Sequence, residues 1–350
     1  MPQSVLPELD ELHRLIELGG PHMDAQVMCK IQMGSHAFDV LSITMGNRAP
    51  SAPAIGFFGG VHGLERIGAE VVLAYLGSLV YRLKWDSLLH TLLSEVRLVF
   101  MPLVNPGGLW QGTRANPQGV DLMRNAPVEA KEETPFLIGG QRLSATLPWY
   151  RGPKGAPMQE ESDALCQTVE HSLLSSPFSA AIDCHSGFGL QDRIWFPFAH
   201  TCEPIAHLAE MHALHRIFDQ AQAYHRYVFE PQSLHYLTHG DLWDHLYLLA
   251  RERHPQHVFL PLTLEMGSWL WVKKNPRQLF SRHGMFNPLI AHRQQRVLRR
   301  HMVLLDFMTR AVASHARWQP DEHERDLHHR QALARWYPDL PHRKHKGLVR

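Results

Sequence analysis

The chain has 350 residues, of which 44% are hydrophobic and 20% are charged, and its formal net charge is +1. This composition is typical of a globular protein with a sizeable core, and the balanced charge gives no reason to expect nucleic acid or acidic lipid as a partner. No apolar run approaches the roughly 20 residues that cross a bilayer. The first residues lack the basic region of a signal peptide, and the four cysteines form no CxxC pair. We therefore expect a reducing, cytoplasmic location and no membrane partner.

Short apolar runs, many of them β-branched, alternate along the chain with longer segments of helical periodicity. Strands are predicted over residues 25–33, 37–45, 54–61, 96–104, 179–185, 193–198 and 258–266. Helices are predicted over residues 64–83, 158–175, 205–222, 241–253, 288–313 and 321–336. This alternation predicts an α/β fold with a mixed, largely parallel sheet that helices cover on both faces.

Two regions fall outside this regular alternation. Residues 127–157 are rich in Gly and Pro and predict a long loop, which we expect to form a wall of the active-site cleft. Residues 315–350 hold many of the 26 histidines, mixed with Arg, Glu and Asp. Histidine-rich segments can bind metal, but this composition favours a solvated helix and tail. We therefore divide the chain into an α/β domain, 1–314, and a C-terminal helix and tail, 315–350.

A histidine and a glutamate, His62 and Glu65, lie in the glycine-rich stretch GGVHGLERIGAE between a predicted strand and a predicted helix. Such a pair can bind one metal ion, because glycines allow the backbone to turn between them. On its own, HxxE is more often a polar turn. His185, in DCHSG after another predicted strand, would complete a His₂Glu set, the ligand type of catalytic zinc peptidases. Cys184 is expected to point away from His185, since neighbouring strand residues face opposite sides.

Two further stretches carry charged residues in positions that suit an active site. The stretch NPGGLWQGTRANPQGVDLMRN, residues 105–125, is too turn-rich to predict a helix, and its two arginines suit an oxyanion or a substrate carboxylate. It fits a polar surface loop equally well. Glu265 interrupts an apolar strand, so it lies either near an edge or in a site as a base with a raised pKa. Reactive groups gather at the carboxyl ends of strands in such sheets, so we expect these residues to converge.

Taken in order, the four stretches resemble the motifs of the zinc metallocarboxypeptidase family, the carboxypeptidase A-like peptidases. The family pattern runs HxxE, then NPDG…RxN…GVDLNRN, then DxHS, then TxE. This chain has HGLE, NPGG…RAN…GVDLMRN, DCHS and TLE. The short gap between RAN and GVDLMRN looks more like that of the compact bacterial members. The resemblance implies that residues 1–314 form a catalytic domain that acts on a peptide or small amide.

The resemblance implies a zinc site with one ion per chain. His62, Glu65 and His185 would bind the zinc ion, with water in the fourth position. Glu265 would act as the general base that takes a proton from this water. Asp121, which matches the aspartate of GVDLNRN, would orient His62 from behind.

The resemblance also implies how the substrate is held. Arg114 would stabilise the oxyanion, and Arg124 would bind a terminal carboxylate of the substrate. Asn116 belongs to the same loop and is assigned to substrate binding or to its scaffold. Tyr236 is a candidate for the mobile tyrosine that closes over the substrate. Met123 departs from the pattern, because it replaces an asparagine that helps to grip the terminal carboxylate.

This departure leaves the substrate open. The hypothesis that we favour is a metallocarboxypeptidase, which removes a C-terminal residue from a peptide. A deacylase of small N-acyl amino acids, like aspartoacylase and succinylglutamate desuccinylase, would use the same zinc chemistry on another amide. A third alternative is a binding protein on a catalytically decayed peptidase scaffold. The sequence does not show which side chain the substrate pocket accepts.

Overall fold

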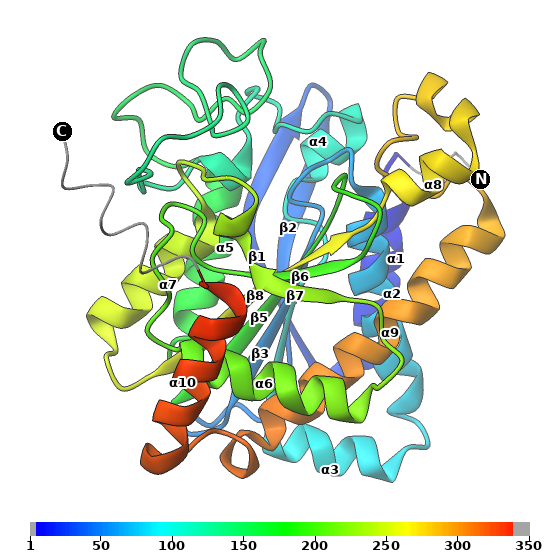
Figure 1. The fold of residues 1–350 in the computed structure, drawn as a ribbon. Helices are drawn as coiled ribbons and strands as arrows, with labels where there is room; N and C mark the ends of the chain where they lie inside the picture. Colours follow the sequence, from blue (N-terminus) through cyan, green and yellow to red (C-terminus); the bar gives the residue numbers. More distant parts are fainter. Residues whose placement is uncertain (1–4, 339–350) are drawn as a thin grey trace, which may run out of the picture.

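A computed structural model describes residues 5–338, in which a central sheet separates two layers of helices (Figure 1). The strands lie in the spatial order β1-β2-β4-β3-β5-β8-β6-β7. Pairing is antiparallel between β1 and β2, β2 and β4, and β6 and β8, and parallel elsewhere. The strand bounds are β1 Met23–Met33, β2 His36–Gly46, β3 Ala54–Gly59, β4 Arg97–Met101, β5 Phe178–Ser186, β6 Arg193–Phe196, β7 Val228–Pro231 and β8 Val258–Met266. The predicted mixed, largely parallel sheet is confirmed.

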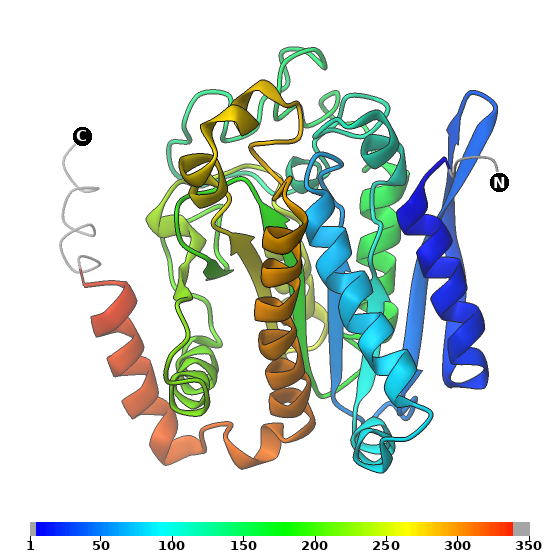
Figure 2. The ribbon, with the colours of Figure 1, turned by 90° about the vertical axis from the view of Figure 1, so that its right-hand side faces the viewer.

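Helices cover both faces of the sheet, as the sequence predicts. Helices α2 and α9 pack side by side on one face, against β3 and β5 (Figure 2). Helices α5 and α7 lie on the other face, where α5 contacts β1 and β2 and α7 contacts β8. The helix bounds are α1 Pro7–Gly19, α2 Arg66–Arg82, α3 Ser87–Glu95, α4 Pro106–Gln111, α5 Glu160–Ser172, α6 Leu208–Ala221, α7 Leu242–Arg253, α8 Trp269–Lys274, α9 Ala291–Ala313 and α10 Glu322–Trp336. Because β3, β4 and β5 are buried along their whole length, their sequences are apolar rather than alternating.

All seven predicted strands and all six predicted helices are present, with ends that differ by a few residues. The sequence pattern did not predict β7 or helices α1, α3, α4 and α8. The expectation that residues 105–125 hold no helix is wrong, because α4 begins directly after Asn105. The Asn105 side chain caps this helix by accepting a hydrogen bond from the backbone N–H of Gly108 at 2.8 Å, and Pro106 occupies the first turn.

Residues 127–157 and 315–350, which fall outside the regular alternation, differ in structure. Residues 127–157 contain no helix or regular strand, as predicted, and form the long loops at the top left of Figure 1. Helix α10 packs against α6, and its Trp336 is 3% exposed among Phe196, Phe229 and His215. The predicted C-terminal helix therefore contributes to the core, while residues 339–350 of the predicted tail lie outside the described part. The division at 314/315 stays a prediction.

No helix within residues 5–338 is both long and apolar enough to cross a membrane. The thiols of Cys29, Cys166 and Cys184 are free. The apolar residues of the two helical layers and the sheet form one continuous core.

A buried histidine at the start of β8 predicts a pH-dependent stability. His257 is 5% exposed, with Nε2 2.8 Å from the Ser179 hydroxyl and Nδ1 3.2 Å from the Leu174 carbonyl oxygen. Burial lowers the pKa of His257 to about 4, below its value near 6.5 in an unfolded chain. Between these values the unfolded chain binds a proton that the folded protein excludes. The free energy of unfolding should therefore fall as the pH falls from about 6.5 to about 4, by at most about 1.4 kcal/mol per pH unit from this group.

Denaturant titrations at several pH values test this expectation. His257→Gln removes the titration and should make the decline between pH 6.5 and 4.5 shallower. His254 lies three residues earlier and is exposed, so His254→Gln should leave the decline unchanged. An identical pH dependence in wild type and His257→Gln would contradict the prediction.

Candidate metal centre and active site

The predicted site residues come from three neighbouring parallel strands. His62 follows the end of β3, His185 lies on β5 and Glu265 lies on β8. The register of β5 and β8 pairs His185 directly with Glu265, and β3 pairs with β5 up to Gly59 and Cys184. Paired residues of adjacent strands point to the same face of a sheet. The sheet itself therefore brings these three side chains to one edge.

Close backbone packing holds the turn that carries His62 and Glu65. A Cβ atom at Gly63 would lie 2.0 Å from the carbonyl carbon of Gly108 in α4. A Cβ atom at Gly68, in the first turn of α2, would lie 2.1 Å from the carbonyl oxygen of Cys184 on β5. Only glycine fits at these two positions. The turn is therefore packed closely between α4 and β5. Glu65, which ends this turn, is 2% exposed and lies beside His185.

His62, Glu65 and His185 form a buried group with the donor atoms of a metal centre. One ligand atom from each lies within 4.8 Å of the other two, and Cys184 is not part of the group. Nδ1 of His62 is buried without a hydrogen-bond partner. Burial lowers the pKa of His62 well below its usual value, so the ring is neutral, as a metal ligand must be. Two imidazoles and one carboxylate are a donor set that suits catalytic zinc.

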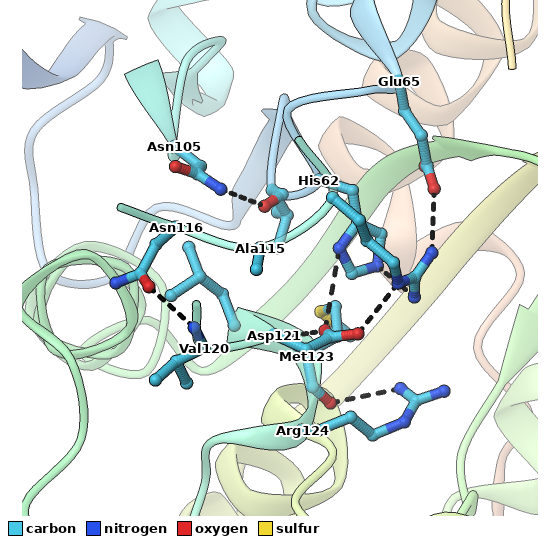
Figure 3. A network of polar contacts seen from close by, with 12 residues as sticks. His62, Glu65, Asn105, Ala115, Asn116, Val120, Asp121, Met123 and Arg124 are labelled. Carbon is cyan, nitrogen blue, oxygen red and sulfur yellow. Dashed lines mark hydrogen bonds and ion pairs between the residues drawn. The ribbon is translucent and has the colours of Figure 1, made fainter. Parts of the chain in front are cut away.

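Arg114 connects the metal-binding group to Asp121 (Figure 3). Its Nε donates to Asp121 Oδ2 at 2.8 Å, one terminal nitrogen lies 2.8 Å from Nε2 of His62, and the other lies 3.3 Å from Glu65 Oε1. Nδ1 of His62 is 3.7 Å from Asp121 Oδ1, which is ion-pair distance rather than a hydrogen bond. The hydrogen bonds of Asp121 go instead to Arg114 and to the backbone N–H of Met123, and its role in orienting His62 stays a prediction.

A small cavity opens beside this group and contains the candidate catalytic and substrate-binding residues. Its lining is His62, Arg114, Met123, Arg124, His185, Trp195, Gln232, Tyr236, Asp241, Thr263 and Glu265. Oε2 of Glu265 is buried without a hydrogen-bond partner. Burial raises the pKa of Glu265 to about 8, against the lowering effect of His185 and with the help of Glu65. An acceptor oxygen with raised proton affinity therefore faces the space beside the metal ligands.

Arg124 offers a positive charge to this cavity. Arg124 is 4% exposed, donates to the backbone carbonyls of Ile138 and Met123, each at 3.3 Å, and also hydrogen-bonds to Tyr236. Within the described part of the chain, no carboxylate lies at ion-pair distance from it. Tyr236 lines the same cavity, and burial raises the pKa of its phenol, which therefore stays protonated. A buried, unneutralised guanidinium is suited to an anionic group of a ligand.

Comparison with known proteins identifies the family. The model of the zinc carboxypeptidase family matches residues 31–253, well over half of the chain. The chain belongs to the zinc carboxypeptidase family. The match includes the HGLE, RAN…GVDLMRN and DCHS stretches, while the TLE strand with Glu265 lies beyond it.

Curated members of the family are distant. Carboxypeptidase D from Anas platyrhynchos is 25% identical over 225 residues, which are 59% of this chain and 14% of that protein. Carboxypeptidase SOL1 from Arabidopsis thaliana is 36% identical over 75 residues, 21% of this chain and 15% of that protein. The matched segments thus span about one seventh of these relatives.

Solved structures of zinc carboxypeptidases share the fold. Thrombin activatable fibrinolysis inhibitor superposes with a TM-score of 0.61 at 19% identity, over 87% of this chain and 74% of that one. Carboxypeptidase A from Helicoverpa armigera superposes with a TM-score of 0.54 at 14% identity, over 84% of this chain and 71% of that one. The α/β fold predicted from the sequence is therefore the fold of these solved structures.

One carboxylate beside the candidate metal ligands, Asp183, was not predicted. Asp183 Oδ2 lies 2.7 Å from Nε2 of His185 and accepts a hydrogen bond from the Trp243 indole at 2.9 Å. A carboxylate on one ring nitrogen fixes the ring and directs the other nitrogen, here Nδ1, toward Glu65. The signal was present in the sequence, because residues two apart on a strand share a face.

Asp183→Asn should weaken zinc binding by about 10–100-fold without unfolding the protein, because the amide no longer supports the His185 ring as a carboxylate does. Competition with a zinc chelator measures the affinity. Asp219→Asn provides a matched control, since Asp219 contacts His225 and His215 away from the metal-binding group. Wild-type zinc affinity in Asp183→Asn would show that this carboxylate does not position the ligand.

Asn116 has a scaffold role, so its assignment to substrate binding is corrected. Its side-chain oxygen accepts from the backbone N–H groups of Gln118 and Val120, at 3.1 and 3.0 Å, and its nitrogen donates to Gln159 and Glu161. Each polar atom of this 2%-exposed side chain is thus occupied within the loop and its contact with α5. Asn116 does not line the cavity.

Further cavity residues were not predicted individually. Trp195 and Thr263 line the cavity from the adjacent strands β6 and β8, where they lie opposite each other. This pairing depends on the strand register, which the sequence does not show. Gln232 has no sequence signal, because it follows the four-residue β7 in a single 3₁₀ turn. Asp241, the first residue before α7, also lines the cavity. Burial and the nearby Asp244 raise its pKa to about 7.

Proposed function

We propose that this zinc carboxypeptidase chain removes a C-terminal residue from a peptide by hydrolysis. The observation that carries the proposal is the buried group of His62, Glu65 and His185 beside the unpartnered carboxylate oxygen of Glu265. Arg124 lines the same cavity without a carboxylate at ion-pair distance, which supports a substrate with a free carboxylate. A metal-binding group, a base and a carboxylate receptor in one cavity are the parts that this reaction needs.

His62, Glu65 and His185 would hold one zinc ion per chain. When bound, zinc supplies a Lewis acid that polarises the scissile carbonyl and lowers the pKa of a water molecule. Glu265 accepts a proton from the attacking water and donates it to the departing amine. Its raised pKa suits both directions of proton transfer near neutral pH. Arg114 donates hydrogen bonds to the oxygen on which negative charge develops.

Arg124 would bind the terminal carboxylate and fix the peptide bond relative to Glu265. The Met123 side chain adds an apolar surface next to it and cannot donate a hydrogen bond to that carboxylate. The carboxylate is therefore held chiefly by charge, with Tyr236 as a further hydroxyl in the cavity. Asp241 and Gln232 are the polar groups left to contact the substrate's side chain. A cytoplasmic location remains part of the proposal and agrees with the free thiols of Cys29, Cys166 and Cys184.

Metal analysis combined with a substrate panel tests the proposed function. Protein purified without chelator should contain about one zinc per chain and cleave peptides with a free C-terminus much faster than their C-terminal amides. Equal cleavage of both peptides would exclude a carboxypeptidase. Cleavage of N-acyl amino acids alone would favour the deacylase. Protein that neither contains nor takes up zinc would favour a binding protein.

A further inference from the structure

A second, larger cavity lies on the α9 side of the sheet and is lined by cations. Its volume is about 510 Å³, within the range of small-molecule sites. Arg226 precedes β7, Lys274 ends α8, and Arg296 lies on α9, so the charges come from three separate elements. Figure 2 shows α8 close to the N-terminal end of α9. The cavity shares no lining residue with the proposed active site.

The positive charge of this cavity is largely uncompensated. Asp192 is the carboxylate in the lining, and it is already occupied by Arg300 and by the backbone N–H of Gly267 at 3.0 Å. Within residues 5–338, the side chains of Arg226, Lys274 and Arg296 form no hydrogen bond or ion pair. Mutual repulsion of such cations costs free energy unless an anion lies between them.

The lining combines exposed cations with apolar side chains, a composition that suits a discrete ligand with anionic groups. Leu270, Trp271 and Val297 add apolar surface to the same lining, so a ligand would be partly shielded from water. The first turn of α9 has no side-chain cap, and this positive end of a 23-residue helix borders the cavity through His292 and Arg293. Guanidinium groups fit phosphate and carboxylate oxygens by paired hydrogen bonds.

We propose that this cavity binds a small molecule with at least two oxyacid groups, phosphate or carboxylate, held between Arg226, Lys274 and Arg296. A ligand with two such groups can pair with more than one of these cations at once. This site is separate from the peptidase reaction and does not depend on the proposed function.

One loop links this cavity to the proposed active site. Leu190 and Gln191 line the cavity, and a Cβ atom at Gly187, in the same loop, would lie 3.8 Å from Glu65 Oε1. Asp192 binds the backbone of Gly267, two residues after Glu265. A ligand held against this loop therefore lies one loop away from a proposed zinc ligand and the proposed base.

Titration calorimetry at about 150 mM salt tests the proposal with fructose 1,6-bisphosphate as the phosphate probe and tricarballylate as the carboxylate probe. At least one probe should bind, and Arg296→Ala and Arg226→Ala should each weaken it by about tenfold or more. The probe that binds identifies the oxyacid class. Thermal unfolding of each variant checks that these substitutions of exposed residues leave the fold intact.

Two control variants locate the binding. Arg299 is exposed on the same helix but outside the cavity, so Arg299→Ala should retain wild-type affinity. Arg124→Gln should also retain it, because Arg124 lines the other cavity. Equal weakening by Arg299→Ala would show diffuse attraction to a basic surface, and loss in Arg124→Gln would place the anion in the reaction cavity. Either result, or the absence of binding by both probes, would overturn the proposal.

Discussion

Replacing Glu265 with glutamine is expected to lower kcat by about 10²–10⁴-fold while zinc stays bound. Glutamine keeps the shape of the side chain but cannot accept the proton of the attacking water. The zinc site should persist, because the donor atoms come from His62, Glu65 and His185 and not from Glu265. Turnover of a free-acid peptide and zinc content measured on the same sample separate these two effects.

Glu70→Gln serves as the matched control. Glu70 is a largely buried glutamate on α2 that accepts a hydrogen bond from Gln294 at 2.7 Å and lies outside the reaction cavity. Burial raises its pKa as it raises that of Glu265. Wild-type turnover is expected for Glu70→Gln. Substantial turnover in Glu265→Gln would refute the assigned base, and loss of zinc in that variant would show a structural role instead.

Replacing Arg124 with glutamine is expected to abolish the preference for a free C-terminus. The substrate carboxylate would lose its charged partner in a buried site, which costs about 2–5 kcal/mol, or about 30-fold or more in kcat/KM. Peptide amides do not carry this charge, so their kcat/KM should change little. The ratio of kcat/KM for the two peptide series is therefore the informative quantity.

This ratio distinguishes a receptor for the carboxylate from a structural arginine. If Arg124 only supports the loop through its bonds to Ile138 and Met123, both peptide series should lose activity in parallel. An unchanged ratio with lower activity would contradict the prediction. Zinc content should be unaffected, since Arg124 does not contact the three proposed ligands.

Much of the fold was readable from the sequence because the elements bury whole apolar runs. The central strands β3, β4 and β5 are apolar throughout, and long helices such as α9 have a clear periodicity. Short elements escaped detection, since four residues such as those of β7 carry no period. Helix α4 was not predicted because two of its six residues are glycines, which have a low helix propensity. The side chain of Asn105 caps and stabilises this helix, and residue propensities do not include such a contact.

The ordered motifs by themselves determined the family and the residue types of the site, because zinc chemistry restricts which side chains can serve as ligands and base. The tertiary structure alone decided which atoms meet. Strand register placed Glu265 beside His185, and the fold turned Asn116 into the scaffold. The cationic cavity was also not predictable from the sequence, because Arg226 and Arg296 are 70 residues apart and line one cavity only in the folded protein. Such contacts depend on long-range packing, which local patterns of charge and hydrophobicity do not encode.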